Sequence, residues 1–138
     1  MRKYTFIAIG GMLGAILRYI IKNIHIVSYK GVIPINTLIL NVSGAFLLTL
    51  ILTLTFKVFE LDADMKLGIT TGFLGAYTTF STLCKEVVNL MEQGNYYSSI
   101  SYVGFSIMMG LAAAYFGVVL GREVVAKYIS NHNGSNNV

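Results

Sequence analysis

The stretch Gly72-Phe73-Leu74-Gly75-Ala76-Tyr77-Thr78-Thr79-Phe80-Ser81-Thr82-Leu83 lies in a segment, residues 67–84, that contains no charged residue. Such a segment is expected to cross a membrane, yet its glycines and its Ser and Thr residues are poor helix formers. Backbone groups in hydrocarbon need partners, and broken helices near the midplane are how membrane proteins build ion sites. Because residue 79 is the midpoint of the predicted span 67–91, we expect a break there. A continuous helix, with Ser and Thr bonded to the preceding turn, is the alternative.

The composition around this stretch is that of a membrane protein. Of 138 residues, 55% are hydrophobic and 12% are charged, where a soluble domain carries about 25% charged residues. A membrane helix needs about 20 apolar residues. We therefore predict an all-α membrane protein with four transmembrane helices, at about 4–21, 32–56, 67–91 and 99–121. They form a single domain, 1–129, followed by a polar tail, 130–138, that we expect to be disordered.

The loop charges barely prefer one side of the membrane. The side with both termini would hold Arg2, Lys3, Lys57, Lys66, Arg122 and Lys127, and the other side Arg18, Lys22, Lys30 and Lys85. Since Lys and Arg set orientation, two readings stay open: insertion both ways, giving an antiparallel dimer, or one orientation fixed by the Arg2-Lys3 pair. The basic residues form no patch, so the sequence predicts no nucleic-acid partner.

Small residues four positions apart predict tight helix packing. The pairs are Gly10 and Gly14, Gly68 and Gly72, and Gly117 and Gly121, a spacing that lets helices approach closely in lipid. Four helices of this length enclose little volume. Any sizeable pathway is therefore expected to need a second subunit.

Neutral hydrogen-bond donors occur at membrane depth. Thr37 and Asn41 share one face of the second helix, and Tyr102, Ser106 and Gly110 share one face of the fourth. Asn41 has two interpretations, a bond between helices or a donor to a substrate. Donors without a mid-span carboxylate suit an anion, whereas a cation or proton path needs an embedded Asp or Glu. No hydroxyl has a His or Asp placed to activate it, so we predict no enzyme.

Three further side chains have open interpretations. The positive ring edge of Phe80 can meet a small anion, or the ring can simply pack. Arg18 is either a snorkelling end residue or a charge that attracts anions at a pore vestibule. Glu86 lies near a span end, where it can pair with a cation or bond a free amide.

The chain resembles the CrcB/Fluc fluoride channels over nearly its whole length. The motifs that carry the resemblance, in the family's order, are Gly10-Gly11-Met12-Leu13-Gly14-Ala15 leading to Arg18-Tyr19, then Asn41-Val42-Ser43-Gly44, then Gly75-Ala76-Tyr77-Thr78-Thr79-Phe80-Ser81-Thr82. The resemblance implies passive export of fluoride across the bacterial cell (plasma or inner) membrane by a multi-pass, antiparallel (dual-topology) dimer with two pores.

The resemblance also implies roles for particular residues. A structural sodium ion would be held by the backbone carbonyls of Gly75 and Thr78 from each subunit. Phe80 would line a pore edge-on and Asn41 would donate from the second helix. Residues near the break and along the polar track would be Ser81, Thr82, Thr37, Tyr102 and Ser106.

Two departures from the family pattern leave alternatives open. Leu83 stands where the family usually has a second phenylalanine, and Gly110 supplies no hydroxyl to the track. The chain is therefore either a homodimeric channel or a non-conducting partner of a paralogous subunit in a heterodimer. A four-helix proton-coupled multidrug exporter would need a glutamate in the first helix, which is absent. A non-transporting membrane scaffold is the remaining alternative.

Overall fold

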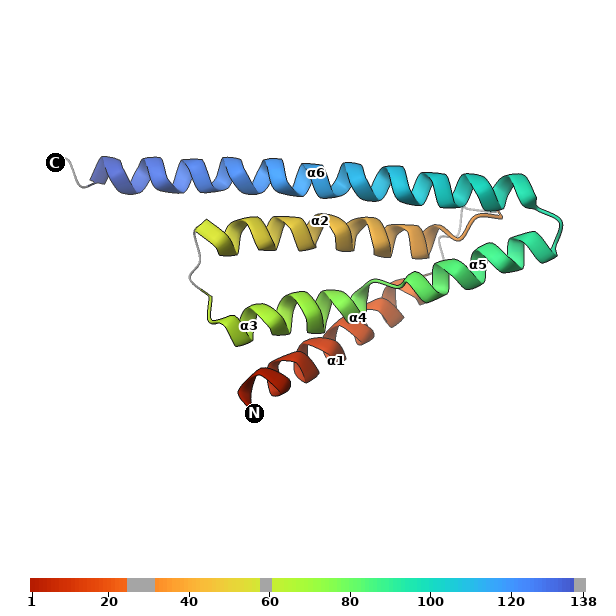
Figure 1. Cartoon of the computed structure of the whole chain (residues 1–138), viewed down its shortest axis with the longest axis horizontal. Coiled ribbons are helices and arrows are strands. Elements are labelled where there is room, and N and C mark those ends of the chain that lie inside the picture. Colours follow the sequence, from red (N-terminus) through yellow and green to blue (C-terminus); the bar gives the residue numbers. More distant parts are fainter. Residues whose placement is uncertain (25–31, 58–60, 136–138) are drawn as a thin grey trace.

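The computed structural model describes residues 1–24, 32–57 and 61–135, without the side chains of 56–57 and 129–135. Every regular element in these ranges is helical, which confirms the all-α class (Figure 1). In chain order they are α1 (Arg2–Asn23), α2 (Ile35–Lys57), α3 (Ala63–Leu67), the π-helix η1 (Gly68–Leu74), α4 (Gly75–Tyr77), α5 (Phe80–Glu92) and α6 (Tyr96–Ser135).

Within the described residues, three continuous helices are long and apolar enough to cross a membrane: α1, α2 and α6. The predicted third span is divided into α3, η1 and α4 on one side of an interruption and α5 on the other. Figure 1 shows α6 alongside α2, the interrupted segment next to α2, and α1 against its first half. The start of α1 and the end of α6 lie toward the same end of the molecule, as expected for an even number of crossings.

Four of the approximate helix boundaries differ from the structure by three residues or more. The third helix starts at Ala63 rather than at 67, and the fourth starts at Tyr96 rather than at 99. The second helix starts at Ile35 rather than at 32, directly after Pro34, whose carbonyl accepts from Leu38. The fourth helix does not end at 121: it continues to Ser135, and so includes residues 130–135 of the tail that was expected to be disordered. The predicted end marked the end of the charge-free segment, whereas the helix continues through Arg122, Glu123 and Lys127; Gly121 packs against Thr53 of α2. Lys30 and residues 136–138 lie outside the described residues.

Glycines bring α1 into backbone contact with η1, as their spacing predicted. A Cβ added at Gly10 would overlap the carbonyl oxygen of Gly68, and one added at Gly14 would overlap that of Phe73. From the other side, a Cβ at Gly72 would lie 2.6 Å from the Ile7 carbonyl oxygen. Such close approach is available only to glycine, so α1 is held against the first half of the interrupted segment.

The contact between α2 and α6 uses glycine in the same way. A Cβ at Gly117 would lie 2.5 Å from the Phe46 carbonyl oxygen, and one at Gly121 would lie 2.7 Å from the Thr53 Cβ. In α2, Gly44 faces Thr78 and Tyr77 at the end of α4. The three glycine contacts together fix α2 between α6 and the interrupted segment.

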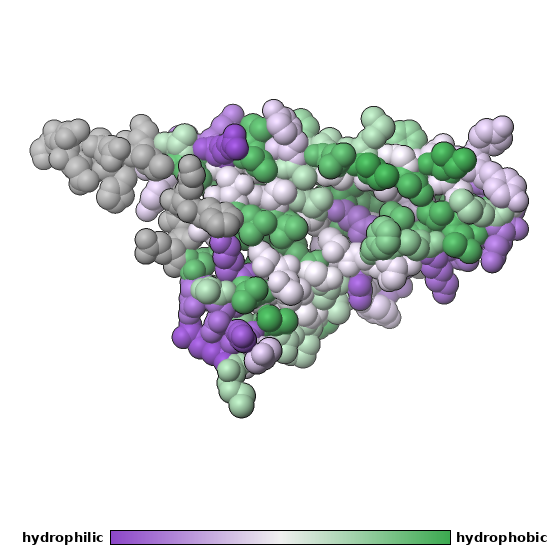
Figure 2. All heavy atoms as spheres, viewed as in Figure 1, coloured by the Kyte–Doolittle hydropathy of each residue, from purple (hydrophilic) through white to green (hydrophobic). Residues whose placement is uncertain are grey.

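The buried core is small and the apolar surface is large. Leu40, Leu74 and Tyr77 form the core cluster, whereas Met108 and Leu111 of α6 are 71% and 69% exposed. Figure 2 shows hydrophobic residues over the middle of the visible face and hydrophilic residues gathered toward its two ends. An apolar surface of this extent fits a hydrocarbon environment and contact with other chains.

Candidate functional site

The interrupted segment is broken at Thr78 and Thr79, which confirms the predicted break. Tyr77 ends α4, Thr78 (φ −77°, ψ 158°) and Thr79 (φ −150°, ψ 110°) are extended, and Phe80 begins α5. The alternative of a continuous helix is therefore excluded. Because these two residues are extended, the backbone hydrogen bonds of a continuous helix cannot form across them. The backbone groups that find no other partner remain available to bind an ion.

Asn41 of α2 supplies two of these partners. Its Nδ2 donates to the Thr79 carbonyl oxygen at 3.0 Å, and its Oδ1 accepts from the Thr79 amide at 2.8 Å. A side-chain amide thus pairs with a peptide group as two peptide groups would. Thr79 is 5% exposed, so both of its backbone groups would be costly if left unpaired. Of the two interpretations of Asn41, the structure shows the hydrogen bond to another segment of the chain.

The pairing releases the Gly75 carbonyl. In a continuous α-helix the amide of Thr79 would bond to the carbonyl of Gly75, four residues earlier. That amide is taken by Asn41 instead. In the same way, the amide of Thr82 would donate to the Thr78 carbonyl in a continuous helix. Here it donates to the hydroxyl oxygen of Thr79 instead, at 3.3 Å. The carbonyls of Gly75 and Thr78 are consequently left without their helical donors.

These released groups border a cavity of about 290 Å³. Its lining residues are Asn41, Gly44, Ala45, Leu48, Thr70, Leu74, Gly75 and Thr78. Nothing lies within 4 Å of a Cβ built at Gly75, so there is open space beside that residue. Unwound carbonyls are the ligands that membrane proteins use for alkali cations. The carbonyl oxygens of Gly75 and Thr78 are therefore ligands of the type that fits a sodium ion.

A chain of hydroxyl groups starts α5. The Thr79 Oγ1 donates to the Thr82 Oγ1 at 2.8 Å, and the Ser81 Oγ lies 3.4 Å from the same Thr79 oxygen. Thr79 is also the residue that caps α5. The structure thus places Ser81 and Thr82 at the break, where the sequence predicted them.

Thr37 and Tyr102 meet at the carboxylate of Glu86. The Thr37 Oγ1 donates to Glu86 Oε1 at 2.8 Å, and the Tyr102 hydroxyl donates to Oε2 at 2.9 Å. Thr37 is 1% exposed and Tyr102 is fully buried. Lys22 Nζ lies 3.5 Å from Oε1. The cation pairing suggested for Glu86 is therefore confirmed, and the two hydroxyls predicted to face a pathway are joined through a carboxylate.

Other predicted site residues lie farther apart. Ser106 bonds to the Tyr102 carbonyl at 2.7 Å, one turn along α6. Phe80 is 79% exposed and Leu83 is half-buried. Arg18 is half-buried and, among the residues that the structure describes, makes no hydrogen bond or ion pair. One chain alone does not bring Phe80 and Arg18 to the Glu86 cluster.

Several functional contacts were missed by the sequence reasoning. The Ser43 Oγ and the Tyr77 hydroxyl are 2.8 Å apart, which ties α2 to α4 beside the break. Asn36 Nδ2 donates to the carbonyls of Ile21, Lys22 and Ile24 at the end of α1. The usable signal was a polar residue in an apolar helix, which Asn36 and Ser43 share with Asn41.

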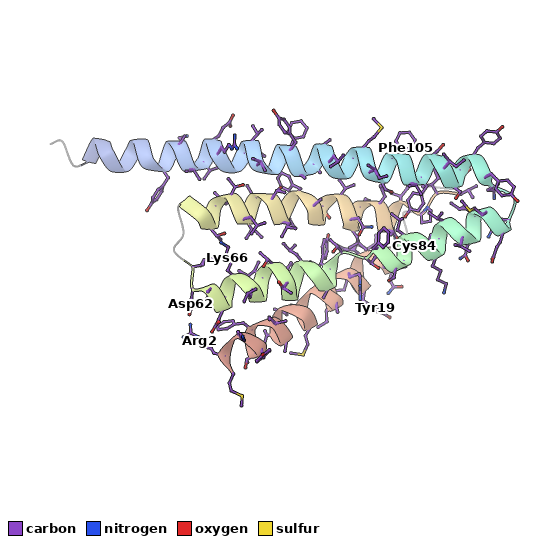
Figure 3. All side chains as sticks on the ribbon, viewed as in Figure 1. Arg2, Tyr19, Asp62, Lys66, Cys84 and Phe105 are labelled. Atoms are coloured by element: carbon purple, nitrogen blue, oxygen red, sulfur yellow. The ribbon has the colours of Figure 1, made fainter. Side chains whose placement is uncertain are left out.

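A charged contact closes the opposite end of the interrupted segment. The Arg2 guanidinium forms an ion pair with Asp62, which caps α3, and lies 3.8 Å from the Asp64 carboxylate. Figure 3 shows Arg2 and Asp62 together near the N-terminus, whereas Cys84 lies on α5 beyond the break. This contact holds the start of α3 against the start of α1 and leaves the break to be shaped by α2.

Comparison with known proteins agrees with this arrangement. The model of the family described as CrcB-like protein, Camphor Resistance (CrcB), matches residues 5–118. The chain is 40% identical over 119 residues to the fluoride-specific ion channel FluC 1 of Staphylococcus aureus strain NCTC 8325, covering 86% of this chain and 96% of that one. It is 38% identical over 125 residues to the fluoride-specific ion channel FluC of Acidobacterium capsulatum, covering 90% and 99%.

A third relative, the fluoride-specific ion channel FluC 2 of Staphylococcus saprophyticus, is 40% identical over 122 residues, with 88% of this chain and 98% of that chain covered. The matched residues include the glycine contacts of α1, the Asn41 pairing and the break. The extent of the family match, together with these relatives, shows that the chain belongs to the CrcB family.

Proposed function

We propose that this protein is a fluoride-selective channel that lets fluoride leave the cell passively across its plasma membrane. The observation that carries the proposal is the break at Thr78 and Thr79, where α2 holds open a segment lined by neutral hydroxyl and amide groups. Fluoride is small and strongly hydrated, so a passage must replace its water with hydrogen-bond donors. The names of the relatives, fluoride-specific ion channels, support the same conclusion.

We assign the donors as the sequence predicted them. Asn41 keeps one N–H beyond the one given to the Thr79 carbonyl. The Ser81 and Thr82 hydroxyls start α5. Thr37, Tyr102 and Ser106 continue the polar track, but in this structure the one O–H of each is donated within the chain, to Glu86 or to the Tyr102 carbonyl. Phe80 presents its ring edge to the anion, and Arg18 attracts fluoride into a vestibule.

The proposal includes a structural sodium ion. Its ligands are the carbonyls of Gly75 and Thr78, and the support is that both have lost their helical donors. When bound, the cation offsets the cost of bringing an anion into a low-dielectric layer.

The working unit that we propose is an antiparallel homodimer. Its support is the near-even distribution of Lys and Arg, the 79% exposure of Phe80, and the cavity beside Gly75, which a single chain leaves open. A second copy would cover the cavity and bring Phe80 to a pathway. Tags at the C-terminus that are reached from both sides of the cell membrane would support dual insertion, and tags reached from one side only would contradict it.

The second candidate is a subunit that needs a paralogous partner. Leu83 favours it, because leucine has no positive ring edge to offer an anion. The test is fluoride efflux from liposomes that contain this protein alone, with protein-free liposomes and chloride efflux as controls. Rapid efflux of fluoride but not chloride supports the homodimeric channel. No efflux from well-folded dimers overturns it and favours the partner subunit.

A further inference from the structure

Four helices meet at the Glu86 carboxylate. Glu86 comes from α5 and has a side chain that is 17% exposed. Thr37 of α2 and Tyr102 of α6 each donate one hydroxyl to it, and Lys22 of α1 provides the positive charge. In the part of the chain that the structure describes, Lys22 is the one cation in an ion pair with Glu86. A partly buried carboxylate is costly unless its charge is compensated, and two neutral hydroxyls do not do this.

The backbone of Lys22 is held in place by α2. Asn36 Nδ2 donates to the Lys22 carbonyl at 3.0 Å, and also to the Ile21 and Ile24 carbonyls at 3.3 and 2.9 Å. Ile21 and Lys22 lie in the last turn of α1 and Ile24 is the residue that follows the helix, where carbonyls run short of helical donors; the Ile21 carbonyl also accepts from the Ile24 amide at 3.2 Å. Asn36 therefore fixes the end of α1 next to α2. The Lys22 ammonium thus reaches Glu86 from a backbone that Asn36 holds in place.

The charge at this position matters for an anion. Thr37 and Tyr102 belong to the polar track of the proposed channel, and both bond to Glu86. An anion that passes these two side chains meets hydroxyls whose protons are already donated to the carboxylate, and in a partly desolvated path the repulsion from that carboxylate is large. Arg18 lies one turn before Lys22 on the same face of α1 but is not paired with Glu86.

We propose that Lys22 is a positioning residue whose ammonium compensates the Glu86 carboxylate, so that an anion can pass the hydroxyls of Thr37 and Tyr102. This inference rests on the proposed function. Arg18 and Lys22 then have different tasks: Lys22 neutralises a fixed negative charge, while Arg18 keeps its charge available to the arriving anion.

The test compares fluoride efflux from liposomes for variants of the full chain. Lys22→Gln should lower the initial rate by roughly tenfold, because an uncompensated carboxylate then faces the anion. Lys22→Arg should stay within about twofold of the unchanged protein, since it preserves the charge. Lys85→Gln is the matched control: it removes a charge next to Glu86 in sequence, from an exposed lysine without a partner among the described residues.

A double variant separates charge compensation from a structural role. In a Glu86→Gln background, Lys22→Gln should change the rate by less than about twofold, because no carboxylate is left to compensate. A tenfold loss in both backgrounds overturns the inference. If Glu86→Gln alone carries no fluoride, the single variants decide: equal losses in Lys22→Gln and Lys22→Arg overturn it. Absence of efflux in the unchanged protein would instead refute the proposed function.

Discussion

Asn41 and Thr79, from different segments of the chain, pair through two hydrogen bonds that run in opposite directions. The pairing stabilises the extended backbone at the break and takes the amide that would otherwise close the helix onto Gly75. The same contact therefore satisfies one peptide group and exposes the carbonyl of another. Asn41 should affect the channel through this pairing as well as through any contact with the anion.

Replacement of Asn41 by alanine should reduce fluoride efflux roughly tenfold, because the Thr79 amide and carbonyl lose their partners at a cost of about 1–3 kcal/mol each. Efflux from liposomes measures the loss, and size-exclusion chromatography checks that dimers still assemble. Asn89→Ala, at an exposed position on α5, is the control and should behave like the unchanged protein. Equal efflux from Asn41→Ala would refute the assigned role.

Phe80→Ile should lower fluoride efflux by about threefold or more, because isoleucine has a similar size but no positive ring edge. Dimer assembly should be unchanged. Phe105 is 56% exposed on α6 and, in Figure 3, lies on the side of α6 away from α2. Phe105→Ile is therefore the matched control. Similar losses in both variants would show that phenylalanine packing in lipid, and not the anion contact, is responsible.

Removal of sodium should impair the channel. Protein purified with a bulky organic cation in place of sodium should show reduced fluoride efflux, and added sodium should restore it, because Gly75 and Thr78 offer only neutral carbonyl oxygens. Dimerisation should weaken in parallel if the ion lies between subunits. Full efflux and full assembly after exhaustive sodium removal would contradict the proposed ion.

Gly14→Ala should destabilise the protein by about 1–3 kcal/mol, since the new Cβ overlaps the Phe73 carbonyl. Gly104→Ala is the matched control: nothing lies within 4 Å of a Cβ there, and alanine in a helix interior is favoured by about 0.5–1 kcal/mol. Thermal unfolding in detergent should therefore shift down for the first variant and not for the second. Two equal shifts would indicate that α1 is not held by backbone contact.

Much of the fold was accessible from the sequence. Segments without charge located the helices, and glycines four residues apart located the seams between α1 and η1 and between α2 and α6. The break followed from the poor helix formers around Thr79 at the centre of an apolar segment. These predictions depend on local composition and on spacing along one helix, both of which are visible in a single chain.

The remaining features depend on contacts between segments that are distant in sequence. Nothing near Thr79 indicates that α2 satisfies its peptide group, and nothing near Lys22 indicates that Glu86, on α5, is its partner. The π-helix η1, which the sequence did not predict, lies in backbone contact with α1. The far end of α6 was misplaced because the prediction ended with the charge-free segment at 121, whereas the helix continues through charged residues to Ser135.

The break also has an electrostatic consequence. The helical run that ends at Tyr77 has its carbonyl end there, and α5 starts with its amide end at Phe80. Helix termini carry opposite partial charges of about half a unit. Two extended residues thus separate a cation-attracting terminus from an anion-attracting one. One interruption of a helix therefore creates a partial negative charge and a partial positive charge close together. A substitution that restored a continuous helix would remove both partial charges.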